Sequence, residues 1–193
     1  EISRAAANHG VEGCDGRTGD AMQTTATMTG DDRQQAFGTL LQRHAGIVFK
    51  AANTYARLPE DRADLAQEIA AQLWRAWPKY DPARSASTWM YRVALNVAIS
   101  HVREQSLRQR HDAVPLDEDL HDMADASGTD HESTEHLRLL QAFIARQPPL
   151  DRALLLLYLE ERPQREIADI LGITESNVST KIGRLKQRIR DEL

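Results

Sequence analysis

The 193-residue sequence contains one cysteine, Cys14, so no disulfide can form within the chain. Aromatic residues make up only 5%, and stretches that alternate Val, Ile or Thr with polar residues are scarce, which argues against a β-sheet protein. The longest apolar run, residues 153–159, is too short to span a bilayer. No basic stretch followed by an apolar one opens the chain, so we expect no signal peptide, no membrane insertion and a reducing, cytoplasmic location.

Helix-forming residues dominate what is present: Ala, Leu, Arg, Gln and Glu are abundant. Apolar residues recur at helical spacing over residues 34–57, 61–77 and about 85–110, then over 137–144 and 150–160. The composition therefore predicts an all-α protein. Neither a Gly-rich loop nor a metal-binding histidine cluster stands out, so we expect no cofactor, no metal and no enzymatic activity.

The net charge of −5 is distributed unevenly. Residues 1–33 carry −3, residues 34–111 carry +5, residues 112–135 carry −9 with no Lys or Arg, and residues 136–193 carry +2. We interpret residues 1–33 as a disordered extension, because they are rich in Gly, Thr and Ala without an apolar period. Two small helical domains, 34–111 and 136–193, then flank a flexible acidic linker, 112–135.

The segment REIADILGITESNVSTKIGRLKQR predicts two short helices joined by a sharp turn. Ile167, Ala168 and Leu171 would form the buried face of the first helix, and Gly172 would supply the positive φ of its C-terminal turn. Thr174 is suited to capping the second helix. This pattern is typical of a helix-turn-helix, whose second helix enters the major groove of DNA.

The second helix divides into an apolar face and a polar face. Its polar face has side chains that can donate to phosphates or to base edges. These residues are Ser176, Asn177, Ser179, Thr180, Lys181, Arg184 and Arg188. A basic helix face is often only solvated, but the joint Ala, Gly, Thr and Val placement favours binding to duplex DNA.

The segment from residue 79 to residue 104 interleaves aromatic and cationic side chains. Tyr80, Trp89 and Tyr91 lie close in sequence to Arg84 and Arg92, a mixture that suits single-stranded nucleic acid. Taken alone, however, a tryptophan on an amphipathic helix is more often a core residue.

A third pattern, DLAQE, places Asp64 and Glu68 four residues apart on one helix face, beside Gln67. Paired carboxylates can act in hydrolysis, but no accompanying nucleophile or metal ligand is evident. An acidic surface for a basic protein partner is the better interpretation.

In their order, DLAQE, YDP, STWMYRVALN, the acidic linker and the terminal helix-turn-helix resemble a bacterial RNA polymerase sigma factor. The resemblance is to the extracytoplasmic-function (ECF) group of the sigma-70 family, which keeps only regions 2 and 4, and it covers about residues 34–193. It implies a promoter-specific initiation factor that works with core polymerase, through the β′ clamp and the β flap. It also implies an anti-sigma factor as a regulatory partner.

The resemblance implies roles for individual residues. Asp64, Gln67 and Glu68 would dock on the polymerase clamp. One group would melt and capture the minus-10 element: Asp81, Arg84, Ser85, Ser87, Trp89, Arg92 and Asn96. The polar face of the last helix would bind the minus-35 duplex, with Ser179, Lys181 and Arg184 nearest the bases.

Two alternatives stay open from the residues alone. A stand-alone helix-turn-helix regulator would explain residues 165–188 but leave DLAQE and STWMYR without a role. A hydrolase using Asp64 and Glu68 would need a site motif that the sequence does not supply.

Overall fold

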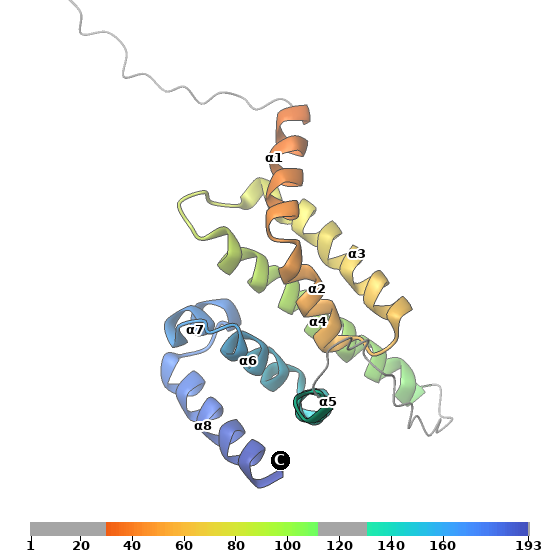
Figure 1. Ribbon diagram of the computed structural model, residues 1–193. Coiled ribbons are helices and arrows are strands. Elements are labelled where there is room, and N and C mark those ends of the chain that lie inside the picture. Colours follow the sequence, from red (N-terminus) through yellow and green to blue (C-terminus); the bar gives the residue numbers. More distant parts are fainter. Residues whose placement is uncertain (1–29, 112–130, 193) are drawn as a thin grey trace, which may run out of the picture.

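The computed structural model describes residues 30–111 and 131–192, and within these ranges all regular structure is helical (Figure 1). This confirms the predicted all-α class. The first part contains α1 (Gly30–Arg43), α2 (Ala45–Tyr55), α3 (Pro59–Ala76), a short 3-10 turn η1 (Trp77–Lys79) and α4 (Ala86–His111). The second contains α5 (His131–Arg146), α6 (Pro149–Leu159), α7 (Gln164–Leu171) and α8 (Glu175–Glu192). Residues 30–33 of the predicted disordered extension lie in α1, and residues 131–135 of the predicted linker lie in α5; the other residues of both segments lie outside the described ranges.

The prediction of one helix over residues 34–57 was wrong, because the chain breaks at His44. The backbone there has φ −118° and ψ 18°, and the weak helix former Gly46 follows. Only Phe37 of α1 is buried, whereas α2 is apolar along most of its length. The break lets α2 enter the core at its own angle while α1 projects away from the body of the protein (Figure 1).

Helices α2, α3 and α4 pack together as the N-terminal bundle. Leu65, Ile69 and Leu73 lie one turn apart on α3 and are fully buried, as the sequence predicts. Truncating one such leucine to alanine costs about 2–5 kcal/mol in typical cores. Pro59 occupies the first turn of α3, where a missing N–H is harmless.

The buried face of α4 is wider than one apolar stripe. Trp89 and Val93 are only partly buried, and the deepest side chains are Met90, Tyr91 and Leu95. The apolar period was correct, but α4 packs against α2 and α3 on one side and α7 on another. A helix enclosed over so wide an arc buries more positions than one apolar stripe contains.

Helix α5 is longer than the predicted 137–144 and buries Phe143. Its end is stabilised by Arg152, whose guanidinium donates to the carbonyl of Gln147 at 2.8 Å and also to the carbonyl of Ala145. The terminal carbonyls of a helix have no partner within it, so this side chain satisfies them.

The helix-turn-helix is confirmed with one change. Gly172 has φ 67°, Thr174 Oγ1 accepts from Asn177 N at 3.2 Å, and the apolar face of α8 is buried. On α7, however, Ile170 is buried and Leu171 only half-buried. Helix α7 packs on α4 as well as on α6 and α8, so it needs apolar contact on a second side.

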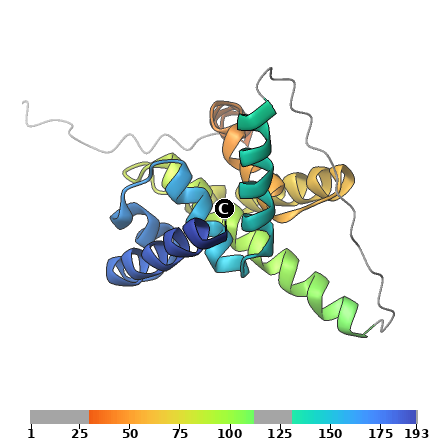
Figure 2. The same ribbon diagram turned by 60° about the horizontal axis from the view of Figure 1, so that its bottom comes forward.

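The C-terminal helices lie directly against the N-terminal bundle, with α6 and α7 beside α2 and α4 (Figures 1 and 2). The buried apolar side chains of both parts form one cluster. Among the described helices, none is both long and apolar enough to cross a membrane.

Candidate nucleic-acid interface

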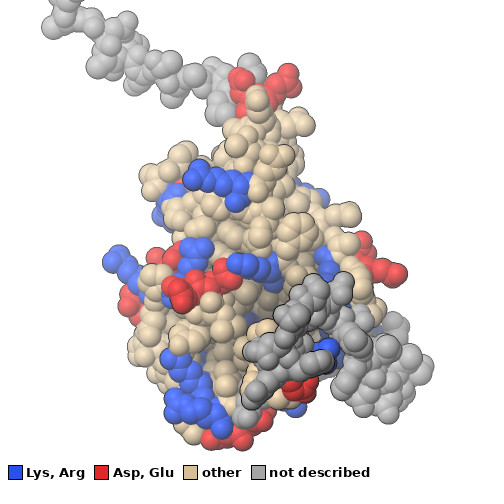
Figure 3. All heavy atoms as spheres, viewed as in Figure 1, with Lys and Arg blue, Asp and Glu red and all other residues tan. Residues whose placement is uncertain are grey.

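The outer face of α8 is open to solvent. Basic side chains lie over this helix, with acidic ones near its end (Figure 3). Six of the seven predicted contact residues are exposed: Ser176, Asn177, Ser179, Thr180, Arg184 and Arg188. Lys181 is half-buried, and its Nζ lies 2.9 Å from Asp151 Oδ1 on α6. The arrangement offers neutral donors at the helix N-terminus, where the helix dipole favours phosphate, and cations further along.

Arg184 and Arg188 differ in their surroundings. Within the described residues no hydrogen bond or ion pair holds the Arg184 side chain. The Arg188 guanidinium lies 5.6 Å from the centre of the Phe143 ring and 3.9 Å from Glu192 Oε1. Arg184 is therefore the more available of the two for a base or phosphate.

The loop before α4 is held in shape by its own hydrogen bonds. Asp81 Oδ1 accepts from Ala83 N at 3.0 Å, and the Tyr80 hydroxyl donates to the carbonyl of Arg84 at 2.9 Å. Ser85 is the N-cap of α4, because its Oγ accepts from Thr88 N at 3.5 Å. Asp81, Arg84 and Ser85 are exposed. A loop folded in this way presents the same polar groups to any ligand.

Trp89 lies in a cluster of aromatic rings beside that loop. Its ring centre is 4.8 Å from that of Tyr80 and 6.1 Å from that of Trp77, and Tyr80 stacks on Trp77 at 5.2 Å. Trp89 is partly buried. Its packing agrees with the core interpretation in part, and its role in binding a single strand stays a prediction.

Arg92 lies three residues after Trp89, and Asn96 lies four residues after Arg92, so the three residues share one face of α4. Both are exposed. Asn96 also borders a shallow groove between α3 and α4 that includes Glu68 and His101. The structure therefore brings the predicted minus-10 face and the predicted clamp-docking face next to each other.

Asp64, Gln67 and Glu68 are exposed on the side of α3 that faces away from Leu65 and Ile69. Glu68 Oε2 lies 3.7 Å from His101 Nδ1. The face is acidic, as a docking surface for a basic partner would be, and Glu68 also borders the shallow groove between α3 and α4.

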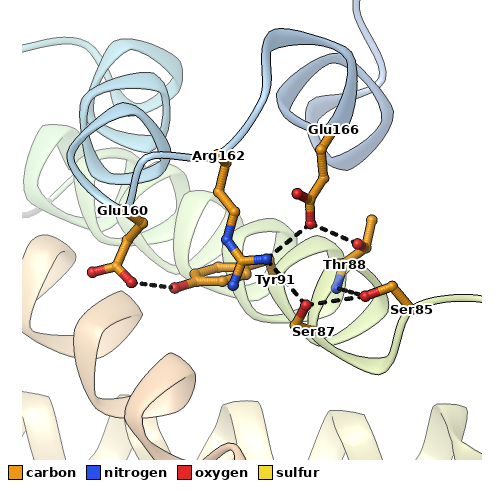
Figure 4. Close-up of polar contacts among 7 residues, drawn as sticks. All are labelled: Ser85, Ser87, Thr88, Tyr91, Glu160, Arg162 and Glu166. Atoms are coloured by element: carbon orange, nitrogen blue, oxygen red, sulfur yellow. Dashed lines mark hydrogen bonds and ion pairs between the residues drawn. The ribbon is translucent and has the colours of Figure 1, made fainter.

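The first turn of α4 also takes part in contacts that the sequence did not predict. Arg162, between α6 and α7, donates to Ser87 Oγ at 3.1 Å and pairs with Glu166 Oε1 at 3.0 Å (Figure 4). The Thr88 hydroxyl donates to the same Glu166 oxygen at 2.7 Å. Part of the predicted minus-10 surface is therefore occupied by the C-terminal domain.

Two further contacts extend this interface. Glu160 accepts from the Tyr91 hydroxyl at 3.3 Å and pairs with Lys50 Nζ at 2.7 Å. Burial, assisted by the Glu160 carboxylate and opposed by Arg162, raises the pKa of Tyr91 to about 12. The guanidinium of Arg162 lies 5.1 Å from the centre of the Tyr91 ring, which is a favourable cation–π distance.

Tyr55 makes a similar contact from α2. Its hydroxyl donates to the carbonyl of Pro149 at 2.6 Å, and Arg152 lies 6.0 Å from its ring centre. Burial raises the pKa of the Tyr55 hydroxyl well above its usual value and lowers the pKa of Arg152. Both tyrosines thus stay protonated while they join the two domains.

No periodicity could have revealed these contacts, because Arg162 and Ser87 are 75 residues apart in sequence. One local feature does mark the segment. Glu161 has φ 56°, a left-handed conformation that is unusual for a residue other than glycine. It closes the end of α6, where Arg162 N donates to the carbonyl of Leu157 at 3.1 Å.

The fold and these surfaces define a helical DNA-binding protein with a helix-turn-helix and a separate aromatic and cationic surface. The chain matches the Sigma-70 region 2 family over residues 40–108 and the Sigma-70, region 4 family over residues 137–189. It belongs to the sigma-70 family of RNA polymerase sigma factors, in the ECF group.

Several proteins are similar to it. The ECF RNA polymerase sigma factor SigE of Mycolicibacterium smegmatis is 31% identical over 95% of this chain and 70% of its own length. The sigma factor CnrH of Cupriavidus metallidurans is 27% identical over 88% of this chain and 93% of its own length. SigW of Bacillus subtilis is 26% identical over 83% and 90%. The solved structure of CnrH in complex with the cytosolic domain of CnrY matches with a TM-score of 0.47 and 24% identity, over 82% of this chain and 87% of that one.

Proposed function

We propose that this chain directs core RNA polymerase to a restricted set of promoters by recognising two separate DNA elements. Helix α8 binds the minus-35 duplex through its exposed polar face. The loop from Asp81 to Ser87, with Trp89, Arg92 and Asn96, melts and captures the minus-10 strand. The observation that carries the proposal is the presence in one chain of an exposed recognition helix and of a hydrogen-bonded polar loop that is flanked by the rings of Tyr80 and Trp89.

The chemistry of the minus-10 surface supports strand capture. Extruding a base costs a few kcal/mol, and stacking on an aromatic ring returns about 1–3 kcal/mol per base. Trp89 and Tyr80 supply the rings, and Arg84 and Arg92 supply charges for the phosphates. The polymerase supplies the nucleotidyl transfer.

The acidic face of α3 is proposed to dock on the β′ clamp, and the C-terminal domain on the β flap. Domain limits of 34–111 and 136–193 and an acidic linker at 112–135 are part of the same proposal. An anti-sigma factor remains an expectation from the family resemblance.

Transcription by purified core polymerase on pooled genomic fragments tests the proposal. We expect transcripts with discrete starts only when the chain is added, and their aligned upstream sequences then define both elements. No stimulation, with specific duplex binding by the chain alone, would instead support a stand-alone regulator.

The clamp contact has its own test. We predict that Asp64→Arg with Glu68→Arg abolishes binding to core polymerase, because like charges across an interface cost several kcal/mol. Asp169→Arg with Glu135→Arg changes the net charge equally on exposed positions outside α3 and outside its groove with α4, and is the control. Retained binding by the first variant, with an unchanged circular dichroism spectrum, would refute the docking role.

A further inference from the structure

The cations of α8 differ in how far the neighbouring helix α6 engages them. The ammonium of Lys181 lies 2.9 Å from a carboxylate oxygen of Asp151. The ammonium of Lys186 lies 4.5 Å from the centre of the Tyr158 ring. Arg184 is exposed, and no hydrogen bond or ion pair holds it within the part of the chain that the structure describes. Helix α6 therefore engages both lysines of the helix that we propose to bind duplex DNA.

The carboxylate of Asp151 is well placed to retain its lysine partner. Asp151 lies in the first turn of α6, where the helix dipole favours a negative charge. Its backbone N–H donates to the carbonyl of Pro148 at 2.9 Å, which fixes the residue in that turn. The side chains of Lys181 and Asp151 are 38% and 17% exposed, so water screens their attraction less than that of a fully exposed pair.

The position of Lys181 in the sequence and the direction of its side chain lead to opposite expectations. Lys181 lies four residues after Asn177 and three before Arg184, so the three residues share one face of α8. Its ammonium, however, is held by α6. A phosphate that displaced Asp151 from Lys181 would leave an unpaired carboxylate next to the DNA backbone, and like charges across an interface are unfavourable. The pair with Asp151 therefore opposes a contact between Lys181 and DNA.

We infer that Asp151 is a positioning residue that withholds Lys181 from DNA phosphates and so limits the affinity of α8 for duplex of any sequence. Phosphate contacts strengthen binding to all sequences, whereas base contacts distinguish between them. Because non-specific sites far outnumber promoters in a genome, one phosphate contact fewer reduces the fraction of the chain bound elsewhere. The inference rests on the proposed function of α8. It gives Lys181 a different role from the base contact that the family resemblance implies.

The salt dependence of duplex binding by the full chain tests this role. Two labelled duplexes are titrated over a range of salt concentrations, one with the minus-35 sequence mapped by transcription and one with a scrambled sequence. Each phosphate that a cation neutralises contributes about −0.9 to the slope of log affinity against log salt. Asp151→Asn should release Lys181 and steepen the slope by about 0.9 on both duplexes. With 1 M salt as the reference, counterion release alone then gives about eightfold tighter binding at about 0.1 M salt.

Lys181→Gln gives an independent measurement, which also decides the question if Asp151→Asn does not fold. Its slope should equal that of the unmodified chain, whereas Arg184→Gln should make the slope shallower by about 0.9. The double variant Asp151→Asn with Lys181→Gln should also keep the unmodified slope. An equally shallow slope in Lys181→Gln and Arg184→Gln would show that Lys181 contacts a phosphate, and would overturn the inference.

The matched control is Asp169→Asn, which removes one negative charge from an exposed position on α7 of the same helix-turn-helix. This change releases no lysine, so the slope should stay that of the unmodified chain. Equal steepening in Asp151→Asn and Asp169→Asn would show that the overall charge determines the slope. Steepening that persists in the double variant would show repulsion between Asp151 and DNA. Either result would overturn the inference.

The two duplexes separate this inference from the proposed function. Unchanged slopes in Asp151→Asn, together with a clear preference of the unmodified chain for the mapped duplex, would overturn the inference and leave the proposed function standing. Equal affinity of the unmodified chain for both duplexes would overturn minus-35 recognition by α8, whatever the slopes. Binding to neither duplex by the unmodified chain and by Asp151→Asn would overturn both.

Discussion

The two surfaces that we propose to face DNA differ in what covers them. The outer face of α8 is exposed along most of its length, and among the described residues Lys181 is the one predicted contact residue there that pairs with a charge on a neighbouring helix, Asp151 of α6. The first turn of α4 has similar polar chemistry, yet Ser87 and Thr88 are engaged by Arg162 and Glu166 from the other domain. Two surfaces with the same kind of side chains can therefore differ in availability, and only the packing of the domains distinguishes them.

Trp89→Ala is expected to have the largest effect and tests the covered surface. It removes base stacking worth about 1–3 kcal/mol together with ring contacts to Tyr80 and Trp77. Promoter opening, followed by permanganate reactivity of unpaired thymines, should fall much more than minus-35 duplex binding.

The control for this change is Trp74→Ala. Trp74 is also an accessible tryptophan of the N-terminal bundle, but it packs on Phe37 at 5.1 Å and lies outside the loop. Equal losses of opening and duplex binding in the Trp89 variant would favour a purely structural role for Trp89.

Arg184→Ala tests the open surface and should weaken minus-35 binding by about 1–3 kcal/mol. Its side chain makes no ion pair among the described residues, so domain packing should not change. Arg190→Ala, near the end of α8, is the control. An equal loss of affinity in both variants would indicate general charge attraction instead of a specific contact, and titration of labelled duplex at two salt concentrations measures this affinity.

Two glycines of the helix-turn-helix are expected to affect the free energy of unfolding in opposite directions. Gly172 has φ 67°, so Gly172→Ala should lower the free energy of unfolding by about 1 kcal/mol. Gly183 lies inside α8 with no atom within 4 Å of an added Cβ, so Gly183→Ala should raise it by up to about 1 kcal/mol. Urea unfolding measures both, and effects of the same sign would contradict this assignment.

Titration of Tyr91 is the mildest probe of the covered region. Its pKa is raised from 10.0 to about 12, so the folded state favours the protonated hydroxyl. The resulting stabilisation is complete below pH 10 and is lost as the pH rises through about 12. Absorbance at 295 nm should show a late tyrosine transition that moves to lower pH in Glu160→Gln. An unchanged transition would show that the carboxylate does not influence Tyr91.

The helices and the turn at Gly172 could be predicted because each depends on nearby residues. The spacing of Leu65, Ile69 and Leu73 specifies one face of α3, and Thr174 caps α8 through a contact three residues away. The prediction of one continuous helix over 34–57 was wrong at His44. Helix propensity is weak there, and the packing of α2 into the core determines where the chain bends. The functions of the individual site residues stay predictions, since they depend on DNA and polymerase.

The sequence alone determined the all-α class, the helix-turn-helix and the family, because helical periodicity, turn chemistry and motif order are properties of neighbouring residues. The tertiary structure alone decided that Ile170 is buried, that Trp89 packs on Tyr80, and that Arg162 covers Ser87. These facts arise from contacts between separate elements, and such contacts depend on how whole helices pack. In this protein, neighbouring residues in the sequence determine which polar and aromatic groups the proposed DNA-binding surfaces carry. The contact between the two domains determines how accessible the first turn of α4 is.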